Sequence, residues 1–111
     1  MKSPVAGFAD ASHRRKELNM TNYLIGYDLD KPSQNYEELF KAIKSLSGSR
    51  GWWHCLDSTW IIQSDLSAAQ IRDLLWAHMG ASDKLLVTAL TRPSAWQGFD
   101  EGCNSWLKNN M

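Results

Sequence analysis

The chain has 111 residues, zero formal net charge, 43% apolar residues and 22% charged residues, which fits one globular domain and is too short for two. No apolar run approaches the ~20 residues of a membrane-spanning helix, so we expect no membrane partner. Tight, non-specific binding to nucleic acid usually needs a basic excess, which this composition lacks.

Residues 1–19 are expected to lie outside the fold, as a disordered, tag or upstream segment. They mix Pro4 and Gly7 with a charged cluster at 13–17 and show no helical or strand period. Met20 then stands directly before the first strand, and we expect it to be the natural start. The segment also lacks the apolar stretch of a signal peptide, which predicts a cytoplasmic protein.

Cys55 and Cys103 lie far apart in the sequence, without the pattern of a metal site. Because cytoplasmic proteins keep their thiols reduced, we expect two reduced cysteines.

The first elements are an apolar strand at 23–27 and a helix. Pro32 stops the strand, because proline cannot donate to a ladder. Asn35 is the expected N-cap of the helix, with Glu38 three residues on, and Gly48 ends it. One face of this helix is apolar, with Tyr36, Leu39, Phe40, Ile43 and Leu46.

Two strands, 51–56 and 59–63, follow as a hairpin with a tight turn between them. The next helix has the clearest signal in the chain. Ser67 is the predicted N-cap and Gln70 completes a capping box, while Gly80 ends the helix.

The last long strand is expected at 84–90. Residues 93–111 form a C-terminal extension in which Asp100 caps a short helix carrying Trp106 and Leu107.

This order of elements predicts an α+β domain at residues 20–92 with the ferredoxin-like βαββαβ fold. Right-handed crossovers favour a four-stranded antiparallel sheet with both helices on one face. The other face must then be polar, be covered by the C-terminal extension or meet a partner. Trp52, Trp53 and Trp60 favour a partner, most simply a two-fold copy of the chain.

Asp28 and Asp30 are the candidate metal ligands. They follow the first strand two residues apart, so an extended backbone directs both carboxylates the same way. A hard cation such as Mg²⁺, or Mn²⁺, needs only one or two protein carboxylates and can activate water at a phosphodiester. An aspartate beside proline and serine also commonly just makes a turn.

His54, Trp53 and Trp60 are the candidate binding residues, and each has a structural alternative. His54 serves either as a general base or phosphate contact, or as a packed histidine. The two tryptophans serve either as stacking platforms for nucleic-acid bases or as core and dimer packing.

Five segments together resemble the small CRISPR-adaptation nuclease-like family, over about residues 22–91. They are Tyr27-Asp28, 56–60 with Ser58 and Trp60, Asp65-Leu66-Ser67, 71–74, and 83–87. The chain is more similar still to the stand-alone SinR-like relatives, which tend to end in a Trp-rich stretch like 96–106. The virulence-associated protein D ribonucleases share the fold.

The resemblance implies a ferredoxin-like homodimer in a mobile-element or defence system. It implies that Asp28 points into the dimer cleft, where two copies share one metal ion, and that Ser58 matches the family's serine. Some members are metal-dependent ribonucleases or deoxyribonucleases, and others are non-catalytic scaffolds that hold DNA.

This chain departs from the family after Asp28, where arginines are usual. Residues 31–38 contain one lysine and two acids instead. We therefore expect a non-enzymatic module that binds nucleic acid or protein, with a metal-dependent endonuclease using Asp28 and Ser58 as the alternative.

Overall fold

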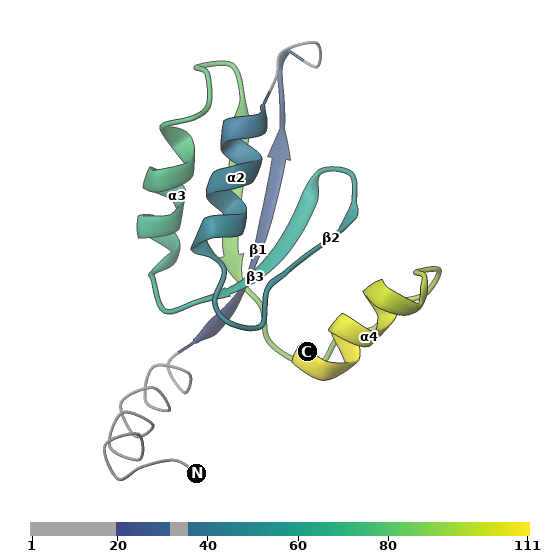
Figure 1. Ribbon diagram of the computed structural model, residues 1–111. Coiled ribbons are helices and arrows are strands. Elements are labelled where there is room, and N and C mark those ends of the chain that lie inside the picture. Colours follow the sequence, from purple (N-terminus) through teal and green to yellow (C-terminus); the bar gives the residue numbers. More distant parts are fainter. Residues whose placement is uncertain (1–19, 32–35) are drawn as a thin grey trace, which may run out of the picture.

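The computed structural model describes residues 20–31 and 36–111, and its elements follow the predicted order (Figure 1). They are β1 (Thr21–Asp28), α2 (Glu37–Leu46), β2 (Trp52–Leu56), β3 (Thr59–Ser64), α3 (Ala68–Trp76), β4 (Lys84–Ala89) and α4 (Glu101–Asn110). The expected strand stop at Pro32 and N-cap at Asn35 lie outside the described residues. In the described part of the chain, no helix is long and apolar enough to cross a membrane.

The four strands form one antiparallel sheet in the order β2-β3-β1-β4. Helices α2 and α3 lie side by side on one face of this sheet, and α4 lies apart from them beside β2 (Figure 1). This arrangement confirms the predicted α+β architecture, which is a ferredoxin-like fold with an added C-terminal helix.

The main core lies between the sheet and the two helices. Alternate residues of β1 and β3 point to the helices, because side chains alternate between the faces of a strand. The buried members of this core are Tyr23, Ile25, Tyr36, Leu39, Ile43, Trp60, Ile62, Ile71 and Leu75. The helix-facing side of the sheet is therefore closed by the chain itself.

A second, smaller cluster covers part of the opposite face. Trp53 of β2, Ile61 of β3 and Leu107 of α4 are its buried residues, and the chain after β4 supplies most of the side chains around them. Helix α4 begins as predicted at Asp100, whose carboxylate accepts a hydrogen bond from the Cys103 N–H at 2.9 Å. The C-terminal extension thus covers the sheet over β2 and β3.

Cys55 of β2 and Cys103 of α4 form a disulfide, with Cα atoms 6.3 Å apart. The expectation of two reduced thiols is therefore wrong. Packing of the C-terminal extension onto Trp53 brings together two cysteines that are 48 residues apart in sequence. On the chain-entropy model, closing a loop of that length stabilises the folded state by about 4 kcal/mol.

The capping box of α3 is confirmed. Ser67 Oγ accepts from the Gln70 N–H at 3.1 Å, and Gln70 Oε1 accepts from the Ser67 N–H at 2.8 Å. Two backbone donors that the first turn of a helix would otherwise leave unpaired are satisfied in this way.

Ser67→Ala should lower the free energy of unfolding by about 1 kcal/mol, because it removes an N-cap acceptor. Urea denaturation monitored by circular dichroism measures this change. Ser45→Ala is the matched control, since Ser45 lies inside α2 and its hydroxyl only donates back to the Ala42 carbonyl at 2.8 Å. Equal losses in the two variants would contradict a specific role for the cap.

Candidate functional site

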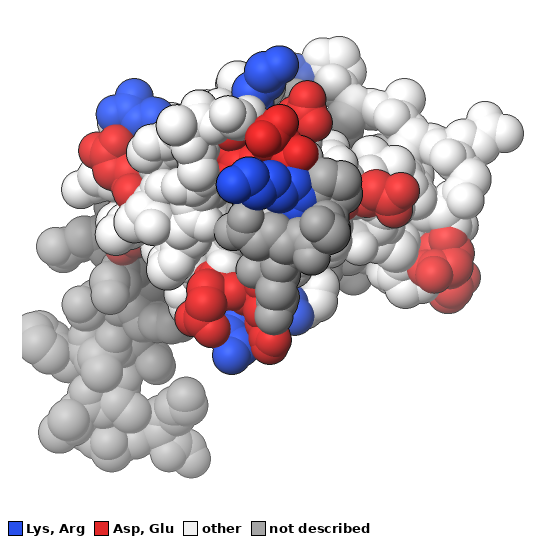
Figure 2. Space-filling model, turned by 90° about the horizontal axis from the view of Figure 1, so that it is seen from above, with Lys and Arg blue, Asp and Glu red and all other residues white. Residues whose placement is uncertain are grey.

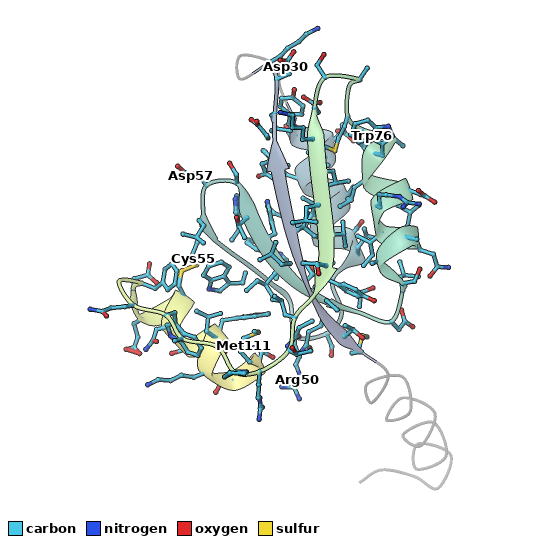
Figure 3. All side chains as sticks on the ribbon, turned by 180° about the vertical axis from the view of Figure 1, so that it is seen from behind. Asp30, Arg50, Cys55, Asp57, Trp76 and Met111 are labelled. Atoms are coloured by element: carbon cyan, nitrogen blue, oxygen red, sulfur yellow. A yellow bond between two sulfur atoms is a disulfide. The ribbon has the colours of Figure 1, made fainter. Side chains whose placement is uncertain are left out.

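The sheet face opposite the helices is uncovered over β1, β4 and the tip of the β2–β3 hairpin. Seen from behind, β1 and β4 lie in front with no element over them, while α4 lies to the side below β2 (Figure 3). We call this region the open face. Its residues are Leu24, Gly26, Asp28, Leu56, Thr59, Lys84, Leu86 and Thr88.

The register of the strands aligns these residues in rows. Gly26 pairs with Thr59 on one side and with Leu86 on the other, and Leu56 pairs with Thr59 beyond a bulge. Directly paired residues lie on the same face of a sheet. Leu86 is 59% exposed and Leu56 is 48% exposed. This row, with a leucine at each end and Thr59 and Gly26 between them, therefore faces solvent, and we call it the apolar row.

Asp28 and Lys84 stand at one end of the open face. They pair directly across β1 and β4, and both are exposed. Asp28 lies on the same face as Leu24 and Gly26, because it follows them at intervals of two residues. The predicted ligand Asp28 is thus a surface carboxylate whose cross-strand neighbour is a lysine.

Ser58, the second residue that the resemblance implies, lies beside the same strand end. Its carbonyl oxygen accepts from the Tyr27 N–H at 3.1 Å, so the fold brings Ser58 alongside the residue that precedes Asp28. Both Asp28 and Ser58 are exposed. The two positions are therefore neighbours in space, although 30 residues separate them in sequence.

Asp30 is held differently, through its backbone. Its N–H donates to Asp83 Oδ1 at 2.7 Å. The same oxygen accepts from the Tyr36 hydroxyl at 3.0 Å, and Asp83 Oδ2 accepts from the Gly80 N–H at 2.7 Å. Asp83 is buried and connects three segments of the chain at this end of the sheet. Its role is structural, and sequence reasoning did not find it.

These contacts set two pKa values. The pKa of Asp83 is lowered, first by the backbone hydrogen bonds from Gly80 and Asp30, because they stabilise the carboxylate. The pKa of Tyr36 is raised, chiefly by burial and also by the neighbouring Asp83. Both directions favour an ionised Asp83 that accepts from a neutral Tyr36.

Trp60 belongs to the main core, and Trp53 belongs to the second cluster beneath the C-terminal extension. Trp60 is 1% exposed, and its indole N–H donates to the Tyr27 hydroxyl at 3.0 Å. Trp53 is 4% exposed, and its indole N–H donates to the Cys103 carbonyl at 3.2 Å. Neither ring offers a free face to a ligand, which fits the alternative in which the two tryptophans serve as core packing.

His54 is a packed, half-buried residue. Its ring stacks on Trp60 with centroids 3.8 Å apart and planes 12° apart. Its Nε2 lies 3.2 Å from the Asp57 carbonyl oxygen, an arrangement in which a protonated Nε2 donates. These contacts fit the structural alternative for His54, since one ring nitrogen and one ring face are already engaged.

The described residues include no group of three or more His, Cys, Asp or Glu side chains placed to hold a metal ion. Within one chain, Asp28 is the carboxylate that the open face supplies. Figure 2 shows acidic and basic side chains interspersed around the end of the molecule where β1 stops.

The comparisons with known proteins add no family to this description. Neither a protein-family model nor a solved structure matches the chain. The resemblance to the CRISPR-adaptation nuclease-like family therefore stays a prediction.

From the sequence, the second sheet face was expected to be polar, to be covered by the C-terminal extension or to meet a partner, and Trp52, Trp53 and Trp60 favoured the partner. The structure places Trp60 in the main core and Trp53 under the extension, so other residues form the open face. The signal was available in β4, where exposed Lys84, Leu86 and Thr88 alternate with the helix-facing Leu85 and Val87. An exposed leucine between two polar residues on one strand face is easily taken for ordinary surface.

Asp83 should make stability depend on pH in acid. Its folded pKa lies below the unfolded value of about 3.9, so its contribution is present above that value and is lost as the pH falls through the folded pKa. Asp83→Asn should unfold at lower urea concentration at pH 7 and lose less stability on acidification. The control Asp65→Asn, an exposed aspartate, should keep the wild-type pH profile. A wild-type profile in both variants would contradict this role of Asp83.

Proposed function

We propose that this protein is a non-enzymatic binding module that forms a two-fold homodimer through its open face. The observation that carries the proposal is the uncovered row of Leu56, Thr59, Gly26 and Leu86 on a sheet whose other face carries the main core beneath α2 and α3. Burying exposed apolar area stabilises an association by roughly 25 cal/mol per Å² before the costs of binding.

The charges at the end of the open face make it self-complementary. A two-fold interface uses the same patch on both subunits, so a residue on one copy meets a different residue on the other. A patch that carries Asp28 beside Lys84 can place its acid against the partner's base, and the reverse. A second copy therefore fits this surface without burying unpaired charge of one sign.

Gly26 supports close approach of a second copy. A Cβ added there would meet Leu24 Cδ2 at 3.6 Å and the Ser58 carbonyl oxygen at 4.0 Å, which is ordinary van der Waals contact. The packing of the chain itself therefore does not require glycine at this position. A flat centre between Thr59 and Leu86 suits a partner surface, where backbone can approach backbone.

The surface around the interface favours a protein partner for the dimer. Acidic and basic side chains alternate at the end of the sheet, so the described surface there lacks the basic stripe that phosphate binding needs (Figure 2). Nucleic acid is the other partner that the resemblance implies, and its binding would weaken steeply with salt.

Leu86→Arg should convert the dimer into a monomer, because it places a charge in the apolar row. Sedimentation velocity measures the change against the chain mass of 12.6 kDa. Leu74→Arg is the matched control, since Leu74 is also an exposed leucine, at 50%, and lies on α3. A monomeric wild type, or a dimer that both variants leave intact, would contradict the proposal.

A metal-dependent phosphodiesterase is the second candidate, favoured by the position of Asp28 on the open face beside Ser58. In the proposed dimer, Asp28 of each copy would hold Mg²⁺ or Mn²⁺, and the ion would supply a Lewis acid for a phosphodiester. The chain's own contribution would be to position two carboxylates and the Ser58 hydroxyl at the interface.

Incubation of single-stranded RNA and duplex DNA with Mg²⁺ or Mn²⁺ separates the two candidates. The enzyme predicts cleavage that Asp28→Asn reduces by about 100-fold or more, while the exposed control Asp57→Asn cleaves like wild type. The binding module predicts no metal-dependent cleavage by any of the three proteins. Equal cleavage by wild type and Asp28→Asn would exclude this site as its source.

A further inference from the structure

Helix α4 depends on its docking to be helical. It has ten residues, including Gly102 and three asparagines, and Leu107 is its buried residue. Isolated helices shorter than about 12 residues are marginal in water even with better helix formers. Detached from the sheet, this segment would lose its structure.

Under the C-terminal extension lies the continuation of the open face. Trp53 pairs with Ile61, and Ile61 pairs with Leu24 of the open face. Trp53 and Ile61 are 4% and 6% exposed, and most of the side chains that pack against them belong to the extension. Displacing α4 would therefore add a second apolar row to the open face.

The disulfide holds the first turn of α4, and weaker contacts hold the rest. Near the disulfide, Phe99 packs edge-on against Trp53 with ring centroids 5.1 Å apart. At the far end, the Trp106 indole donates to the Arg50 carbonyl at 2.9 Å, and Asn22 Nδ2 donates to the Asn110 carbonyl at 2.7 Å. Loss of the Cys55–Cys103 bond would leave one end of the helix without a covalent anchor.

The main core is separate from this attachment. The buried residues between the sheet and helices α2 and α3 include none of those beneath α4. Release of the C-terminal extension can therefore occur while the ferredoxin-like domain stays folded.

We propose that the Cys55–Cys103 disulfide is a redox latch: it holds α4 in place when oxidised and so determines how much of the sheet belongs to the open face. Both cysteines are half-buried, and we expect a small dithiol to reach their sulfur atoms. One thiolate of the dithiol attacks Cys55 Sγ and expels the Cys103 thiolate. The second thiol then attacks the mixed disulfide, which releases Cys55 as a thiol and oxidises the dithiol to a disulfide. Reduction frees α4, uncovers Trp53 and Ile61, and strengthens association with a second copy.

Hydrogen exchange with and without dithiothreitol tests the latch itself. We expect the amides of α4 to exchange about tenfold faster or more after reduction, while those of α3 stay protected. The double variant Cys55→Ala/Cys103→Ala should exchange like the reduced protein under both conditions. Unchanged protection of α4 on reduction would overturn the latch, and equal loss in α3 would mean that the disulfide only stabilises the whole domain.

The effect on association rests on the proposed dimer and is measured separately by sedimentation of the oxidised and reduced proteins. We expect the dimer dissociation constant to fall by about tenfold on reduction. Faster exchange in α4 with a monomer in both states would refute the proposed dimer and this effect on association, but leave the release of α4 standing. A dimer whose dissociation constant is the same in both states would show that the latch does not control association through the open face.

Discussion

The four-stranded sheet carries apolar side chains on both of its faces, so both faces must be buried against other parts of the chain or against a partner. The rest of this structure follows from how a short chain meets that constraint. Helices α2 and α3 close one face with the main core. The other face receives the C-terminal extension, which buries Trp53 of β2 and Ile61 of β3. The surface that remains is the open face, and it includes Leu86 and Gly26 at its centre.

The C-terminal extension packs against the sheet through few residues, so its own packing stabilises it only weakly. Its helix buries one leucine, and its sequence favours helix weakly. The bond between Cys55 and Cys103 compensates by removing the freedom of the intervening chain. Because a disulfide can be reduced, the attachment of the C-terminal extension to the sheet depends on the redox state of these two cysteines. Coverage of the sheet and the redox state of the cysteines are thereby coupled.

The parts of this fold that short sequence patterns encode were predictable. The capping box of Ser67 and Gln70 involves residues three apart, and Asp100 caps α4 through a residue three positions on. The order of elements then restricts the topology, because crossovers have one hand. Local signals of this kind suffice for the sheet and the helices.

Contacts between distant residues were not predictable. Asp83 accepts from Asp30, 53 residues away, and nothing in its local sequence marks it as buried. Cys55 and Cys103 meet only because the extension folds back over Trp53. The candidate site shares this limit. The sequence shows that Asp28 ends the first strand, but it does not show that Lys84 lies beside it.

Hydroxyl-radical footprinting over a range of protein concentrations tests most directly whether the open face is the docking surface. Side chains buried by association should lose reactivity as the protein concentration rises, while other exposed side chains keep theirs. We predict that Leu86 becomes protected and that Leu74 on α3 does not. Unchanged reactivity of Leu86 at every concentration, or protection of Leu74 instead, would contradict the account.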